Sequence, residues 1–271
     1  MKLSSGLCRW AFALLAIVPG TLWAVPITVD QLDLSEDQKV ALLRQLQAPG
    51  IAKLLSSPAI AFGSPVGFGQ VLGEASVGLA GQILPPDNQD SLDGSMGASV
   101  GLGSSRVVGV ELGVNVISLT EGFGDSGSFS AKMHKLLNNT SAISVGVESF
   151  GAWGLAKQRD PSVFAAITHV VNVSGLNMPL AMNIGIGNGR FRDDLQNTEN
   201  DNVGVFGGFA LIVDPRLSLI ADYTGVGLSL GVSVVPVATL PFTATLGFSN
   251  VTEQENGSAE FAGAIGYRFV F

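Results

Sequence analysis

The chain has 271 residues, of which 46 % are hydrophobic and 13 % charged, and it carries a formal net charge of −8. An acidic chain without a basic cluster is a poor partner for nucleic acid, so we expect none to bind. After residue 24, no apolar run approaches the roughly 20 residues that a membrane helix requires, and apolar residues are instead interleaved with Gly, Ser, Thr and Asn.

Residues 1–24 have the pattern of a secretory signal peptide. Basic residues precede a short apolar core at 10–18, a Pro-Gly pair ends that core, and residues 22–24 form an acceptable cleavage site. We therefore expect export through a cleaved signal. Cys8, the one cysteine of the chain, lies within this segment, so the exported protein would have no disulfide and no cysteine metal site.

Residues 25–66 differ from the rest of the chain. A capping box at 35–38 precedes a short helical stripe at 40–46, and Pro49-Gly50 ends it. The segment is expected to lie in the periplasm and to contain this short helix. It could dock a periplasmic partner or plug the domain that follows. A short amphipathic helix that packs loosely on that domain is the simpler interpretation, because such stripes are common.

From residue 67 to 271, strand patterns recur. Within 106–119, Val108, Val110 and Leu112 alternate with Gly109 and Glu111, and this period of two is typical of strands. The small, sparsely charged second face suits a narrow lumen better than the outer face of a soluble sandwich. About twelve strands are predicted, at 69–82, 94–103, 106–119, 128–137, 141–153, 163–173, 179–191, 203–213, 217–224, 226–235, 239–250 and 259–271.

The connections between these strands alternate in length. Those after odd-numbered strands are mostly long and polar, and those after even-numbered strands are short, with the tight link at 223–227 as the exception. Outer-membrane barrels show this asymmetry, with long loops outside and short turns in the periplasm. The pattern predicts an even strand number and places both ends of the domain on one side.

The last strand ends the sequence on an aromatic residue. One of its faces is large and apolar, with Phe261, Ile265, Tyr267, Phe269 and Phe271. This resembles the terminal strand of bacterial outer-membrane β-barrel proteins, which typically ends in Phe and is read by their insertion machinery. The resemblance implies an all-β fold, a transmembrane antiparallel up-and-down barrel of about twelve strands. It also implies location in the bacterial outer membrane, with lipid and the insertion machinery as partners.

The two histidines do not form a recognisable catalytic pattern. Twelve-stranded outer-membrane phospholipases carry a His and a Ser two residues apart on a strand, and neither His134 nor His169 has such a Ser. Neither has a His, Asp or Glu at that spacing that could complete a metal site. We expect no enzymatic activity, no cofactor and no metal.

The remaining candidate site is a set of charges that strand phasing directs into the barrel. These are Glu74, Glu111, Lys132, Glu148, Asp222, Glu260 and Arg268, together with His134. They could line a mildly acidic channel that favours cations. Equally, they could be ion pairs that cross-link a closed barrel, because buried charges must be paired.

We interpret the chain as a signal peptide (1–24), a periplasmic segment (25–66) and a barrel (67–271) that resembles a porin and passes small polar solutes or ions. A first alternative is a closed structural or surface-interaction barrel that uses loops 84–93 and 192–202. A second is a soluble, secreted all-β protein, which would also show alternating strands.

Overall fold

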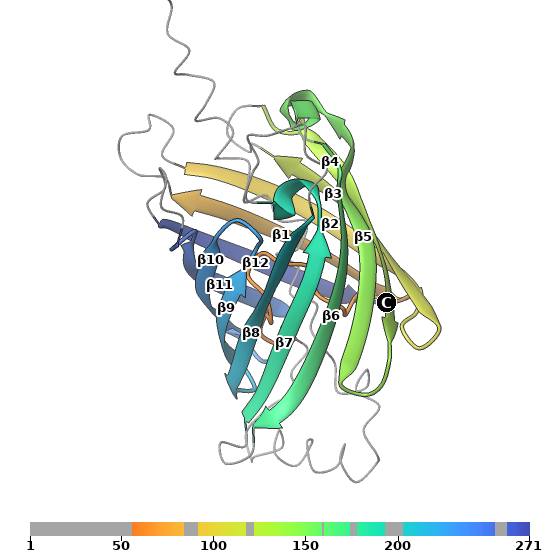
Figure 1. Cartoon of the computed structure of the whole chain (residues 1–271), viewed down its shortest axis with the longest axis vertical. Helices are drawn as coiled ribbons and strands as arrows, with labels where there is room; N and C mark the ends of the chain where they lie inside the picture. Colours follow the sequence, from red (N-terminus) through yellow and green to blue (C-terminus); the bar gives the residue numbers. More distant parts are fainter. Residues whose placement is uncertain are drawn as a thin grey trace, which may run out of the picture.

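The computed structural model describes residues 56–83, 92–117, 122–158, 160–173, 178–192, 203–252 and 259–271. Twelve antiparallel strands form one closed barrel, in which each strand pairs with the next along the chain and β12 pairs with β1 (Figure 1). The strands are β1 (Glu74–Ile83), β2 (Leu92–Ser104), β3 (Val108–Ile117), β4 (Gly127–Leu136), β5 (Ser141–Trp153), β6 (Ser162–Val173), β7 (Met178–Gly187), β8 (Gly204–Asp214), β9 (Leu217–Tyr223), β10 (Leu228–Val234), β11 (Phe242–Ser249) and β12 (Glu260–Val270).

Two short 3-10 helices follow strands, η1 (Gly154–Gln158) after β5 and η2 (Gly189–Phe191) after β7. Within the described ranges, no helix is long and apolar enough to cross a membrane. The expected signal peptide, the capping-box helix and most of loops 84–93 and 192–202 lie outside the described residues.

The barrel closes where the sequence predicted, between its first and last strands. The β1–β12 register runs from Glu74 opposite Val270 to Ile83 opposite Phe261. Phe271 extends this seam, because its N–H donates to the Gly73 carbonyl at 2.9 Å. The ladder therefore has no open edge between its first and last strands.

The first strand begins later than the sequence pattern suggested, at Glu74 rather than at residue 69. A turn precedes it, in which the Glu74 N–H donates to the Val71 carbonyl at 3.0 Å and Gly73 has a φ of +92°. That left-handed conformation suits glycine. Residues 69–73, which the alternation assigned to the first strand, instead precede β1 and lie outside the named strands.

The two ends of the barrel carry different connections. We call the end where β1 begins and β12 ends the base, and the opposite end the mouth. At the base, residues 105–107 join β2 to β3 and residues 215–216 join β8 to β9, whereas the β7–β8 connection at the mouth spans 188–203. The predicted alternation of long and short connections is present, and the short 224–227 link at the mouth remains its exception.

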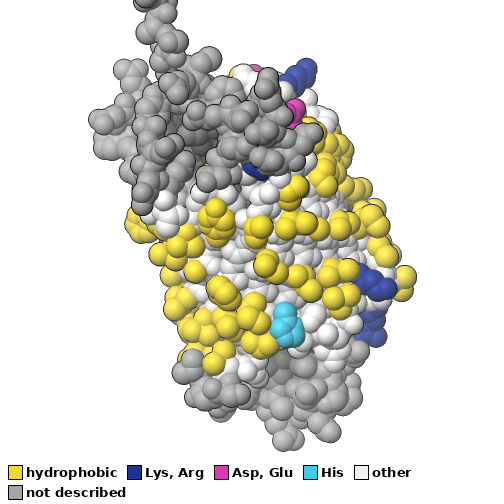
Figure 2. Space-filling model, in the orientation of Figure 1, with side chains coloured by type: hydrophobic (Ala, Val, Ile, Leu, Met, Phe, Trp, Pro, Cys, Tyr) yellow, Lys and Arg dark blue, Asp and Glu magenta, His cyan; other side chains and the backbone are white. Residues whose placement is uncertain are grey.

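The two faces of the wall differ sharply in polarity. In β10, Leu230 and Val232 are exposed on the outside, whereas Ser229 and Ser233 are buried on the inside. The same division recurs in other strands, and hydrophobic side chains spread across the barrel surface in Figure 2. A band of apolar side chains facing outward is what a lipid environment stabilises.

A charge on this outer face should be costly if lipid surrounds it. Ile184 of β7 is 58 % exposed, and Ile184→Arg should lower the free energy of unfolding by about 2–4 kcal/mol near the bilayer midplane. The measurement is denaturant unfolding of the protein refolded in phospholipid vesicles. Val237→Arg, at an exposed site in the 235–241 connection, is the matched control and should cost much less. Equal losses for the two variants would contradict a lipid-facing wall.

Candidate functional site: a lumen filled by the preceding segment

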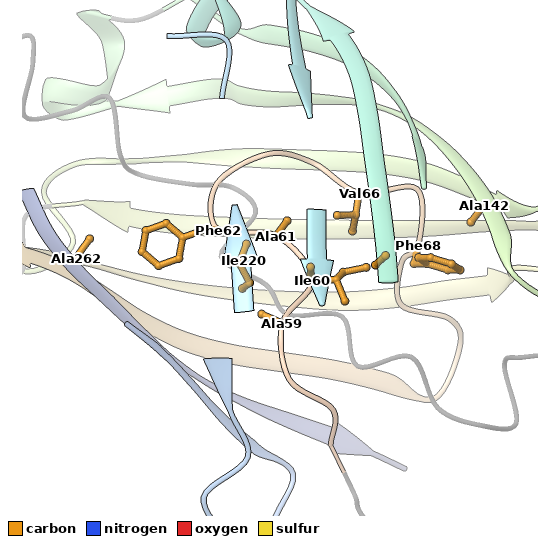
Figure 3. Close-up of a cluster of buried hydrophobic side chains, with 11 residues drawn as sticks. Ala59, Ile60, Ala61, Phe62, Val66, Phe68, Ala142, Ile220 and Ala262 are labelled. Atoms are coloured by element: carbon orange, nitrogen blue, oxygen red, sulfur yellow. The ribbon is translucent and has the colours of Figure 1, made fainter. Parts of the chain in front are cut away.

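Residues 56–70 lie inside the barrel, and residues 71–73 lead from them into β1; we call residues 56–73 the lumen segment. From 56 to 70 every residue is buried except Ser57, which is partly buried. The segment appears in orange within the ring of strands in Figure 1, and Figure 3 shows its loop between the walls. Part of the stretch that the sequence assigned to the periplasm, 56–66, thus occupies the lumen.

The path of the lumen segment follows from its polar contacts. The Ser56 and Thr243 hydroxyls lie 2.6 Å apart at the start of β11, and the Ala59 N–H donates to Ser233 Oγ at 2.9 Å near the end of β10. Both positions are at the base. The segment then reaches toward the mouth and returns to the base, where Leu72 bridges to Gly101 near the end of β2. It therefore forms a re-entrant loop.

Apolar packing holds the loop against the wall. Large side chains come from the segment and small ones mostly from the strands, in a single cluster: Ala59, Ile60, Ala61, Phe62, Val66 and Phe68 against Ala142, Ala181, Ala210, Ile220 and Ala262 (Figure 3). Alanines on the wall leave the space that the segment's larger side chains fill.

Two glycines let the returning limb lie flush on the wall. A Cβ on Gly67 would stand 2.1 Å from the Ala142 carbonyl oxygen, and one on Gly69 would stand 2.2 Å from the His134 ring. Real Cβ atoms do not approach so closely. The backbone of the segment therefore touches the wall directly, at a distance that only glycine permits.

Wall side chains satisfy the backbone of the returning limb. The Gly67 N–H donates to Thr168 Oγ1 at 2.8 Å, and Ser144 Oγ donates to the Val66 carbonyl at 3.0 Å. Asn183 donates to the Pro65 carbonyl at 2.7 Å. A buried extended chain without a neighbouring strand needs such partners, because unpaired N–H and C=O groups are costly.

Gln70 is the anchor of the segment at the base. Its N–H donates to Glu111 at 3.0 Å, and its side-chain amide bonds Ser76 and Ser99 at 2.6 and 3.1 Å. Its carbonyl lies 2.8 Å from His134 Nε2. A carbonyl can only accept, so this contact requires the His134 proton to be on Nε2.

Two charged wall residues, Asp222 of β9 and Arg190 of η2, hold the tip of the loop in an arrangement that we call the tip clasp. Asp222 Oδ2 accepts the N–H groups of Phe62 and Ser64 at 2.9 and 2.8 Å, and its Oδ1 accepts the Ser64 hydroxyl. Arg190 donates to the Gly63 carbonyl at 3.1 Å and pairs with Glu148 at 2.5 Å. The Arg190 guanidinium also lies 4.2 Å from the centre of the Phe191 ring.

The structure brings most of the candidate lumen charges into pairs. Glu111 and Lys132 lie 3.2 Å apart, and Glu74 pairs with Arg268 across the β1–β12 seam. Glu260 lies at the mouth end of β12, in alternation with Arg268. The role of these lumen charges in conduction stays a prediction.

Arg190 is the lumen charge that the sequence pattern did not reveal. In the structure, Arg190 pairs with Glu148. Arg190 belongs to η2 rather than to a strand, so alternation along the chain carries no information about where its side chain points. A basic residue shortly after a glycine-lined strand was the available signal.

The expected insertion-signal residues lie on the outer face near the base. The Tyr267 and Phe269 rings are 4.9 Å apart, and Phe269 and Phe271 are exposed. Aromatic side chains at this height suit a membrane interface. Recognition of these residues by an insertion machinery stays a prediction.

A Ser–His contact that no sequence spacing indicated occurs on the outer face. Ser141 and His169 are paired across β5 and β6, with Ser141 Oγ 2.7 Å from His169 Nδ1. No group of three potential metal ligands occurs among the described residues.

Comparisons with known proteins give structural likenesses at low sequence identity. Neither a family model nor a curated protein sequence matches this chain. The COG4313 outer membrane channel from Pseudomonas putida F1 aligns with 75 % of this chain and 97 % of its own length, at 14 % identity and a TM-score of 0.46. The outer membrane protein Omp33 from Acinetobacter baumannii aligns with 75 % of this chain and 100 % of its own length, at 11 % identity and a TM-score of 0.37. The barrel assignment itself rests on the strand pairing of this chain.

Because the lumen segment lies directly against the wall, a larger side chain at position 67 should destabilise the protein. Gly67→Ala would push a methyl group against the Ala142 carbonyl, so the segment must shift or leave its seat. Overpacking of this kind should lower the free energy of unfolding by about 1–3 kcal/mol. Urea unfolding in lipid vesicles measures the loss.

Gly266→Ala is the matched control for this change. Gly266 lies in β12, and an added Cβ would meet only the Val77 oxygen, at 4.0 Å. The control should unfold close to the wild-type midpoint. A Gly67→Ala midpoint that coincides with that of the control would contradict the seat described for the segment.

Proposed function

We propose that this protein is a porin-like channel of the bacterial outer membrane, which passes small polar solutes or ions. The observation that carries the proposal is the closed twelve-stranded barrel, with an apolar outer face and a polar inner face. A closed barrel leaves no unpaired strand edge in lipid. The solved structures that resemble the chain are described as outer membrane proteins, one of them as a channel, in agreement with this proposal.

The lumen segment narrows the path that a solute would take. Its residues 56–70 cross the interior of the barrel, and charged wall residues that include Asp222, Arg190 and Glu111 bond to it. This observation favours a second candidate, a closed structural or surface-interaction barrel, in which the same contacts serve only stability. Conduction separates the two candidates.

The charges that face the lumen are expected to favour cations. Among the described residues, the acids of the inner face (Glu74, Glu111, Glu148, Asp222 and Glu260) outnumber the bases of the lumen (Lys132, Arg190 and Arg268). A surplus of carboxylates raises the local cation concentration in a narrow pore.

The proposal includes the route to the membrane. Residues 1–24 would direct export and be removed, and the terminal strand with Tyr267, Phe269 and Phe271 would be read by the insertion machinery. The barrel would hold no cofactor and catalyse no reaction, and residues 25–55 would remain on the periplasmic side, where they could contact a partner.

Purified protein in a planar lipid bilayer should produce discrete conductance steps in KCl, because a continuous polar lumen admits hydrated ions. Folding is checked in parallel by a shift in gel mobility on heating. A preparation that shows this shift but stays silent at every voltage would overturn the channel and leave the closed barrel.

Lys132→Gln should shift the reversal potential in a KCl gradient further toward cation selectivity. Its charge pairs with Glu111 on the inner face, and its loss leaves that carboxylate facing the lumen. Lys135→Gln is the control, because Lys135 lies on the same strand but is exposed on the outer face. The same reversal potential for both variants would mean that Lys132 does not face the conduction path.

A further inference from the structure

We propose that the lumen segment is a displaceable plug and that the tip clasp, Asp222 with Arg190, is the contact that keeps it seated. The proposal rests on the channel function proposed above and adds how that channel is closed. It concerns residues 56–73 and their partners on the inner wall.

The barrel wall is complete without the segment. Each strand pairs with two neighbours, including β1 with β12 at the seam, so the sheet gains no ladder from residues 56–70. The contacts of the segment are side chains of the wall that bond its backbone, together with packing against small residues such as Ala181 and Ala210. Its removal therefore leaves the closed hydrogen-bonded ring intact.

The wall groups that hold the segment can form hydrogen bonds both when the segment is seated and when it is displaced. Ser144, Thr168, Asn183 and Ser233 are small, neutral and polar, and each bonds the segment when it is seated. When the segment leaves, water can make the same hydrogen bonds. An apolar wall would have no such replacement. The inner face is thus stable around a peptide and around water, as a reversible plug requires.

The strength of the contacts is uneven along the segment. At the base, the turn at Gly73 continues directly into β1, and Gln70 is held by Glu111, Ser76, Ser99 and His134. At the tip, the buried Asp222 is 1 % exposed and accepts three hydrogen bonds from Phe62 and Ser64. Arg190 and Asn183 add single bonds to the neighbouring Gly63 and Pro65 carbonyls. Hydrogen bonds to a charged group are the stronger class.

The difference between the contacts at the base and those at the tip indicates which end of the segment moves. The base end stays attached through β1, and the tip, with residues between Ala59 and Pro65, moves away when Asp222 no longer holds it. A displaced tip exposes Ala61, which is 8 % exposed when seated, to water in the lumen. Asp222 would then face the conduction path as a carboxylate.

Thiol labelling at residue 61 tests the plug independently of conduction. Ala61→Cys is introduced into a Cys8→Ser background, and the protein in lipid vesicles is treated with a water-soluble maleimide. Asp222→Ala should raise the labelling rate on the order of tenfold, because the rate follows the population of the displaced state. Asp214→Ala, which alters an exposed aspartate outside the lumen, is the control and should leave the rate unchanged. Equal rates for Asp222→Ala and the control, in proteins that both show the heat-dependent gel shift, would overturn the proposal.

A second variant and a conductance measurement complete the test. If Asp222→Ala does not fold, Ser64→Ala, which removes the hydroxyl donor to Asp222, should still raise the labelling rate severalfold, and an unchanged rate would overturn the clasp. In bilayers, Asp222→Ala should also conduct more than wild type. Faster labelling in a silent barrel would support the plug and refute the channel, whereas conduction with unchanged labelling would support the channel and refute the plug.

Discussion

The pairing of β12 with β1 is the constraint on which the rest of the structure depends. Once the last strand closes on the first, every strand has two neighbours, and the sheet separates an inside from an outside. Side chains alternate across a strand, so each strand then sends one set of residues outward and the other into a confined space. Exposed residues such as Leu230 and buried residues such as Ser229 differ because of this separation.

Polar groups that face the confined lumen need hydrogen-bond partners, and the lumen segment supplies them. Serines, threonines and asparagines on the inner wall need hydrogen-bond partners, and so does the backbone of an extended chain that has no neighbouring strand. Thr168 with the Gly67 N–H and Ser144 with the Val66 carbonyl satisfy both demands at once. The same wall would be satisfied by water, so the polarity that stabilises the filled barrel is also the polarity that a conducting barrel needs.

The lumen charges have two kinds of partner. Glu111 with Lys132 and Glu148 with Arg190 are ion pairs, in which removal of one member leaves a buried charge uncompensated. Asp222 instead has N–H and hydroxyl donors from the lumen segment. Its environment therefore changes when the segment moves, which links the filling of the lumen to the charge along the path.

The sequence by itself determined the strand pattern, the alternation of polar and apolar faces, the closure by the last strand and the inward direction of charges such as Glu111 and Arg268. These features follow from the period of two in a strand, which depends only on local backbone geometry. Only the tertiary structure decided that residues 69–73 leave the wall, that Arg190 folds back onto Glu148 and that Ser141 meets His169. Those outcomes join residues far apart in the chain, and a local pattern that fits a strand also fits an extended segment lying inside one.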